Sequence, residues 1–186
     1  MKKIMTKPCI FLSLFLALFA LTSCTGTPDK VTPVSQFDVN RYLGKWYEIA
    51  RLNHSFEEGL DQVTAQYSLN NDGSIKVINR GFNKKDNEWS EAEGKAYFVD
   101  DKNIGHLKVS FFGPFYSSYI VYALDENYQY AFVSGYKTDY LWLLSRTPQV
   151  SEELKQRFVE QAKRLGFPTE ELIFVEQKVP AKVLEK

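Results

Sequence analysis

The chain has 186 residues, a formal net charge of zero at pH 7, and 44% hydrophobic and 15% aromatic residues. This length fits one domain with a single core, and the high aromatic content favours β-structure around an apolar interior. No basic stripe runs along the sequence, so the electrostatic signature of a nucleic-acid-binding protein is missing and nucleic acid is excluded as a partner.

The first 23 residues predict a bacterial lipoprotein signal peptide. A lysine-containing start precedes an apolar run over residues 9–21, which is too short to cross a bilayer as a mature helix. The run ends in Leu21-Thr-Ser-Cys24, which resembles a lipobox, in which the cysteine is acylated and becomes the first residue after cleavage. An ordinary secretory signal with an incidental cysteine is the alternative. Because Thr25 and not Asp follows, we expect sorting to the outer membrane of a Gram-negative bacterium, on its periplasmic side.

Cysteine usage limits the chemistry of the rest of the chain. The two cysteines are Cys9, inside the predicted signal peptide, and Cys24, the predicted lipid anchor. The folded part therefore has no thiol for a disulfide, a nucleophile or a metal site. We expect residues 24–35 to form the lipidated N-terminus and an extended tether, residues 36–178 the folded domain, and residues 179–186 a frayed tail.

From Lys45 onward, short segments with β-branched and aromatic residues alternate with turn sequences, of which Asn70-Asn-Asp-Gly73 is a strong hairpin signal. The pattern predicts an all-β fold, an eight-stranded up-and-down antiparallel β-barrel. The predicted strands are Lys45–Leu52, Val63–Leu69, Ser74–Asn83, Glu91–Val99, His106–Phe112, Tyr119–Leu124, Tyr130–Tyr136 and Asp139–Ser145.

The periodicity becomes helical after Pro148. Ser151 is a good N-cap, Gly166 is a natural stop, and the apolar residues between them recur at helical spacing. We expect one C-terminal α-helix packed against the outside of the barrel. A short final strand is predicted at Leu172–Glu176.

Alternation along the predicted strands separates an inner face from an outer face. Leu107, Val109 and Phe111 share one face, whereas Lys108 and Ser110 share the other. An eight-stranded barrel is wide enough to hold one small ligand, and its many aromatic residues suit an apolar molecule with a polar end. The candidate ligand contacts are Tyr67, Asn79, Phe98, Val109, Phe111, Tyr119, Val121 and Trp142.

Three residues are predicted to close one end of the barrel as its floor. Gly44 permits a close backbone approach, and Trp46 is large enough to plug a small barrel. Arg146 has a planar guanidinium suited to stacking on an indole ring. We expect these residues to be structural, whereas Trp142 is the better candidate for ligand contact.

The remaining ionisable groups give no sign of a metal site or a cofactor. His54 and His106 lack the neighbouring ligands of a metal site, so we expect a solvated loop histidine and a solvated strand-end histidine. Glu48 shares the parity of Trp46, which leaves two alternatives, contact with a polar headgroup or a buried, paired carboxylate.

Three ordered segments resemble the conserved regions of the lipocalin family: Gly44-x-Trp46-Tyr47, Thr138-Asp-Tyr140, and Arg146 ahead of a helix. Longer runs, including Tyr42–Arg51 and Asp139–Pro148, are similar to the bacterial outer-membrane lipoprotein branch, which is related to apolipoprotein D. The resemblance implies a calyx-shaped barrel that stores or transports small hydrophobic molecules. Relatives of this branch place residues matching Tyr67, Asn79 and Trp142 in the pocket. The disulfides of many animal members cannot form here.

The resulting hypothesis is a membrane-anchored protein that binds fatty acids or lysophospholipids in the envelope, with a suggested part in envelope maintenance under stress. One alternative is an envelope interaction protein with a vestigial pocket. A lipocalin-fold enzyme is the least favoured, because no Ser-His-Asp order, thiol or metal cluster is evident. A homodimer is left open.

Overall fold

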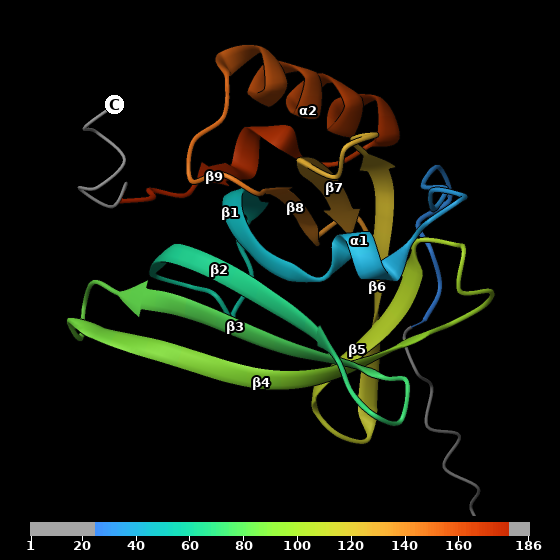
Figure 1. Ribbon diagram of the computed structural model, residues 1–186. Coiled ribbons are helices and arrows are strands. Elements are labelled where there is room, and N and C mark those ends of the chain that lie inside the picture. Colours follow the sequence, from blue (N-terminus) through green and yellow to red (C-terminus); the bar gives the residue numbers. More distant parts are fainter. Residues whose placement is uncertain (1–24, 179–186) are drawn as a thin grey trace, which may run out of the picture.

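The computed structural model describes residues 25–178, so the predicted signal peptide, Cys24 and the predicted tail lie outside the described residues. Within these limits the chain forms a β-barrel with one long helix on its outside (Figure 1). The elements are α1 (Val39–Tyr42), β1 (Gly44–Leu52), β2 (Leu60–Leu69), β3 (Ile75–Asn83), β4 (Glu88–Phe98), β5 (His106–Phe112), β6 (Phe115–Leu124), β7 (Tyr130–Ser134), β8 (Leu141–Ser145), α2 (Glu152–Leu165), the 3₁₀ turn η1 (Thr169–Glu171) and β9 (Leu172–Phe174).

Strands β1 to β8 pair antiparallel in sequence order, and β1 closes the barrel by pairing with both β2 and β8. The predicted eight-stranded barrel is therefore confirmed, with β9 added outside along β1. Several strand limits differ from the prediction: β2 begins at Leu60 and not at Val63, and β4 begins at Glu88 and not at Glu91. β6 begins at Phe115 and not at Tyr119, and residues 135–140 form a loop between β7 and β8.

The barrel has a closed end and an open end, which we call the floor and the mouth. Helix α1 lies across the floor, and the mouth is ringed by the loops at 53–59, 84–87, 113–114 and 135–140. β1 spans both ends, because its first half pairs with β2 and its second half pairs with β9. Where β1 and β2 separate, the Gln177 side-chain amide donates to the carbonyls of Glu48 and Val63, each at 2.8 Å.

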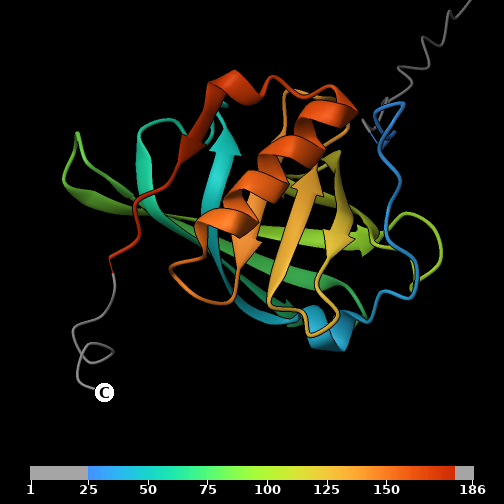
Figure 2. The ribbon, with the colours of Figure 1, turned by 90° about the horizontal axis from the view of Figure 1, so that it is seen from above.

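Helix α2 covers the outer face of the barrel on one side (Figure 2). Its limits match the prediction: the Ser151 hydroxyl accepts the backbone N–H of Leu154, and Gly166 is left-handed at φ 92°. Phe158 is fully buried against Phe132 of β7, with ring centroids 5.0 Å apart. Burial of such a ring contributes about 1.5–3 kcal/mol, so the helix stabilises the strands beneath it.

The N-terminal segment, residues 25–36, lies along the barrel wall beside β5 and β6 (Figure 1), where the sequence predicts an extended tether over residues 24–35. Val31 is buried in the outer apolar cluster. The backbone of Val34 accepts from Gly105 and donates to Val121, at 2.8 and 2.9 Å. The segment is therefore held by the domain through much of its length. No helix in residues 25–178 is long and apolar enough to cross a bilayer.

Candidate ligand-binding cavity

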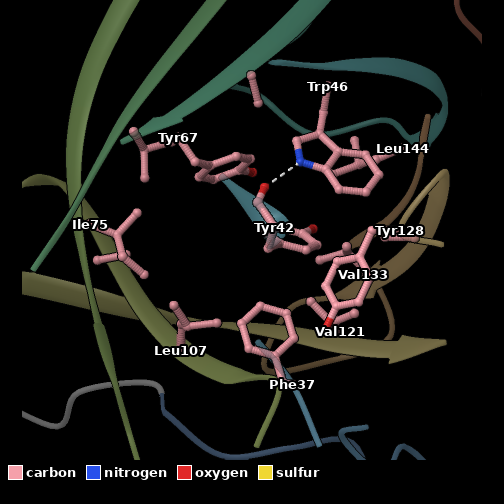
Figure 3. Packing of buried hydrophobic residues seen from close by; sticks show 14 residues of the cluster. Phe37, Tyr42, Trp46, Tyr67, Ile75, Leu107, Val121, Tyr128, Val133 and Leu144 are labelled. Atoms are coloured by element: carbon pink, nitrogen blue, oxygen red, sulfur yellow. Dashed lines mark hydrogen bonds between the residues drawn. The ribbon is translucent and has the colours of Figure 1, made fainter. Parts of the chain in front are cut away.

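The interior of the barrel holds an apolar cavity of about 710 Å³. Its lower walls come from β2, β3 and β5, where Tyr67, Ile75 and Leu107 point toward the same central space (Figure 3). Cavities of 300–1,000 Å³ with mostly apolar walls are typical of small-molecule sites. The cavity is therefore large enough for an alkyl chain.

The floor beneath the cavity is closed by Trp46 and Arg146. The Arg146 guanidinium lies over the indole, 3.9 Å from the ring centroid. The indole N–H donates to the Tyr42 carbonyl at 2.8 Å (Figure 3). Gly44 has φ 94°, which a residue with a side chain adopts at a cost. Arg146 also donates to four backbone carbonyls, those of Arg41, Leu43, Lys45 and Tyr128, at 2.8–3.3 Å.

Three tyrosine hydroxyl groups meet where the floor joins the cavity. Tyr119 of β6 lies between the other two, 2.7 Å from the Tyr42 hydroxyl and 2.9 Å from the Tyr67 hydroxyl. Burial raises the pKa of all three phenols, so they stay neutral and serve as hydrogen-bonding groups. The cavity therefore has a polar spot at its deep end.

A buried ion pair lies in the cavity wall toward the mouth. The Arg51 guanidinium donates to the Glu48 carboxyl at 2.7 Å and to the backbone carbonyls of Glu57 and Leu60. Glu48 lines the cavity and is almost fully buried. Of the two alternatives for Glu48, the structure shows the buried, paired carboxylate.

Glu57, from the loop between β1 and β2, lies between the Glu48–Arg51 pair and the aromatic side chains at the mouth. Its Oε2 atom lies 3.0 Å from His54 Nε2 and accepts the indole N–H of Trp142 at 3.1 Å. The buried carboxyl groups of Glu48 and Glu57 therefore have different partners, Arg51 for Glu48 and His54 with Trp142 for Glu57. Burial and the charge of Glu57 raise the pKa of Glu48 well above its ordinary value. Burial opposes the ionisation of Glu57, but the hydrogen bond and charge of His54, with Trp142 and Arg51, lower its pKa overall.

The prediction of two solvated histidines is wrong. His54 is buried beside Glu57, its ring stacked on Phe56 with centroids 3.9 Å apart. His106 is buried on the outer wall, with Nε2 3.2 Å from the Ser118 hydroxyl. Each lies where a loop or an N-terminal segment folds back over it, an effect that a strand pattern does not indicate.

Six of the eight candidate contact residues line the cavity, and two do not. Phe98 packs edge-on against Phe37 in the closed end, and Val121 is fully buried beside the N-terminal segment. Both belong to the packed interior and not to the open space. The six on the cavity wall are Tyr67, Asn79, Val109, Phe111, Tyr119 and Trp142.

Strand alternation fails at one place on the wall. Ser110 is predicted to face outward with Lys108, but it is buried and lines the cavity together with Phe111. The pairing of β5 with β6 is irregular between Val109 and Phe112, which lets two successive side chains reach the same space. The Ser110 hydroxyl and the Asn79 side-chain oxygen have no hydrogen-bond partner in the described residues, so both are free to meet a ligand.

Sequence reasoning missed the acidic and aromatic side chains of the mouth loops, chiefly Phe56 and Glu57. Both lie in a loop without periodicity, so no pattern places them over the cavity. Tyr140 follows the parity of Trp142 and stacks on it with centroids 6.2 Å apart. Its neighbour across the loop, Tyr136, lines the same opening.

A barrel with a closed floor, an apolar cavity and a partly polar mouth defines a binding protein for small apolar molecules. Residues 37–177 match the lipocalin-like domain family. The chain belongs to the lipocalin family, within its outer-membrane lipoproteins of Gram-negative bacteria, and is a lipid-binding lipoprotein.

Among relatives, the outer membrane lipoprotein Blc of Vibrio cholerae serotype O1 is 59% identical over 166 residues, which cover 89% of this chain and 97% of the relative. The protein of the same name from Escherichia coli K12 is 52% identical over 163 residues, covering 87% and 92%. Apolipoprotein D of Macaca fascicularis is 34% identical over 142 residues, covering 73% and 72%. Insecticyanin of the tobacco hornworm Manduca sexta has the same fold, with a TM-score of 0.65, 20% identity, and coverage of 84% and 88%.

Proposed function

We propose that the cavity holds the acyl chain of a fatty acid or lysophospholipid, with the polar end of the lipid at the mouth. The observation that carries this proposal is the apolar cavity of about 710 Å³ above a closed floor. Burial of each methylene contributes about 0.8 kcal/mol. Eight to ten buried methylenes would outweigh the ordering costs and reach about micromolar affinity. A cavity of this size favours this proposal over a vestigial pocket.

The mouth provides polar groups for the head of such a lipid. Glu48 and Glu57 belong to the cavity wall, and the indole of Trp142 lies beside them. Asn79 and Ser110, also on the cavity wall, each have an unpaired polar atom. The proposed lipid therefore lies with its tail toward Tyr67 and its polar end between the mouth loops.

Filling the cavity tests this proposal. The substitution Val109→Trp places a large ring on the cavity wall, and we expect at least about tenfold weaker binding of a fluorescent long-chain fatty acid, a loss of about 1.4 kcal/mol. Ile78→Trp on the outward face of β3 is the control, since it adds the same ring outside the cavity. Equal affinity of both variants and the wild type, or an absence of lipid in mass spectra of the purified wild type, would contradict lipid binding in the cavity.

The proposed anchor is the acylated Cys24, which would hold the domain at the periplasmic face of the outer membrane. Several acyl chains in the bilayer give an attachment that a single chain cannot give. We expect Cys24→Ser to move the protein from the membrane fraction to the soluble fraction, measured by fractionation and immunoblotting. Ser23→Ala, which keeps a small residue before the cysteine, is the control. Retention of the Cys24→Ser variant in the membrane would contradict anchoring through Cys24.

Membership of a family of binding proteins supports a role without catalysis. Turnover of a bound lysophospholipid, seen as a new product by mass spectrometry and lost in Val109→Trp, would contradict this part of the proposal. Sedimentation at several concentrations would decide between a monomer and a homodimer.

A further inference from the structure

The mouth of the barrel carries large apolar side chains in contact with solvent. Phe112 and Phe115 face each other at the tip of the β5–β6 hairpin and are 80% and 70% exposed. Phe56, in the β1–β2 loop across the opening from this hairpin, is 55% exposed. All three rings lie on the rim of the cavity. Leu69 at the floor end, Trp89 in β4 and Phe174 in β9 are 48–51% exposed, so the two most exposed large apolar side chains of the described residues lie at the hairpin tip.

The N-terminal segment is fastened to the same hairpin. The Ser118 hydroxyl donates to the Gly26 carbonyl at 2.7 Å and also contacts His106, at 3.2 Å. Ser118 is three residues from Phe115 on the same strand, a distance of about 10 Å. The contacts between the N-terminal segment and the barrel wall therefore reach the half of β6 that is nearer to the mouth.

Chain length then limits how far the anchor can lie from the mouth. Cys24 is two residues before Gly26, and two residues span at most about 7 Å. A lipid on Cys24 would therefore enter a bilayer within about 20 Å of the hairpin tip. A free tether of twelve residues would impose no such limit.

We propose that Phe112 and Phe115 at the hairpin tip, with Phe56 across the opening, insert into the lipid surface that holds the anchor, so that the cavity mouth opens onto the membrane. The inference rests on the proposed function, because it requires acylation of Cys24 and a lipid in the cavity. A single-chain lipid then moves between bilayer and cavity without crossing bulk water.

A membrane fits this surface better than a second copy of the chain does. The anchor keeps the mouth beside the bilayer, so its effective concentration there is high whatever the protein concentration. The apolar rings come from two loops around an opening and not from one flat patch, and aromatic side chains are favoured at the boundary between headgroups and acyl chains. Lys108 on the same hairpin, 5.5 Å from the Tyr116 ring, adds a cation for lipid phosphates.

A depth measurement tests this orientation. Residues 25–178 contain no cysteine, so Phe115→Cys can be labelled with an environment-sensitive dye in the full lipidated protein, in vesicles of phosphatidylethanolamine and phosphatidylglycerol. We expect a blue-shifted emission that spin-labelled lipids quench. The control is Leu69→Cys at the floor, where we expect an unshifted and unquenched dye. Equal, water-like emission at both positions would overturn the proposal.

A second arm separates a membrane from a second copy. Protection of the Phe115→Cys dye without vesicles, growing with protein concentration, would assign the surface to self-association and overturn the proposal. In contrast, protection that requires vesicles and is independent of protein concentration supports insertion.

Transfer kinetics separate this inference from the proposed function. The measured quantity is the ratio of the rate of lysophospholipid uptake from vesicles to the rate of its uptake from water. In the variant with Phe112→Ser and Phe115→Ser, we expect this ratio to fall at least about tenfold. Leu69→Ser is the control, with an unchanged ratio. An unchanged ratio in the double variant would overturn the inference and leave lipid binding intact. No uptake from either source by the wild type would instead refute the proposed function.

Discussion

The floor and the mouth of this barrel differ in how far their polar groups are paired and their apolar side chains are buried. At the floor, Trp46 is fully buried, and Arg146 covers its ring and donates to four backbone carbonyls. At the mouth, Arg51 pairs with the buried Glu48 carboxyl and donates to the Glu57 backbone carbonyl, while the ring of Phe112 is exposed to solvent. The two ends are built from the same eight strands.

The difference separates stability from binding along one axis of the molecule. Satisfied hydrogen bonds and full burial stabilise the floor, whereas unpaired polar atoms and exposed rings at a cavity are features that a ligand can complete. Substitutions at the floor should therefore lower the free energy of unfolding, and substitutions at the mouth should change binding first. Three predictions test this division.

The largest effect is expected for Arg146→Ala at the floor. The change removes a cation over the Trp46 ring and leaves carbonyls of α1 and β1 without their donor, so we expect a loss of about 3–5 kcal/mol. The melting temperature should fall by roughly 10 °C, as measured by calorimetry. Affinity for a fatty-acid probe should stay the same at temperatures where the variant is folded.

The matched control is Arg157→Ala. Arg157 also lies over an aromatic ring, 5.0 Å from the centroid of Tyr130, but on the exposed surface of α2. We expect a change of at most about 0.5 kcal/mol. A normal melting temperature of Arg146→Ala together with lost binding would reverse the assignment of the floor as structural.

An intermediate effect is expected for Tyr119→Phe, where the floor meets the cavity. The substitution removes the hydroxyl that links Tyr42 to Tyr67 and leaves two buried hydroxyls without it, so we expect a loss of about 1–3 kcal/mol by urea denaturation. Tyr47→Phe is the control, since its ring contacts Lys45 on the barrel exterior. Similar losses in the two variants would show that the linked hydroxyls add nothing specific.

The smallest effect, with the opposite sign, is expected for Glu48→Gln near the mouth. The pKa of Glu48 is raised in the folded state, so its ionisation destabilises the fold as pH rises from the ordinary value of 4.5 through the raised pKa. Glutamine keeps an acceptor for Arg51 and has no proton to lose. We expect the variant to melt about 2–4 °C higher than the wild type at neutral pH, an increase that about 1 kcal/mol produces.

The pH dependence supplies the control for that prediction. At pH 3, well below the ordinary pKa of 4.5, Glu48 is protonated in both states and the two melting temperatures should agree. Glu93→Gln should show no such rise at neutral pH, because Glu93 is exposed and pairs with Lys76 on the surface. A lower melting temperature of Glu48→Gln at neutral pH would mean that the charge of Glu48 stabilises the fold through Arg51.

The barrel could be predicted from the sequence because its signals are local. Alternation along Leu107-Lys-Val in β5 and the turn at Asn70–Gly73 depend on neighbouring residues, and so do the caps of α2 at Ser151 and Gly166. Trp46 and Arg146 are distant in sequence, but each has a side chain suited to few other places in a small barrel. Their stacking is present in the structure.

The mouth could not be predicted in the same way because its geometry depends on contacts between loops. A loop glutamate such as Glu57 is usually solvated, and only the folded chain shows it buried between His54 and Trp142. The irregular pairing near Val109 turns Ser110 inward, and strand parity carries no signal of such a shift. The N-terminal segment has the composition of a linker, so its attachment to the wall was equally hidden.

Because helix α2 lies on one side, the strands of the barrel are not equally covered by packed side chains. Strands β7 and β8 are covered on both faces, by the cavity side chains within and by Phe158 and its neighbours without. The hairpins from β2 to β4 have no such cover, and their charged outer residues face water. We therefore expect local opening of the sheet to start in that half. A lipid too bulky for the resting cavity would be accommodated by the pliable hairpins, while the helix-backed strands keep the floor in place.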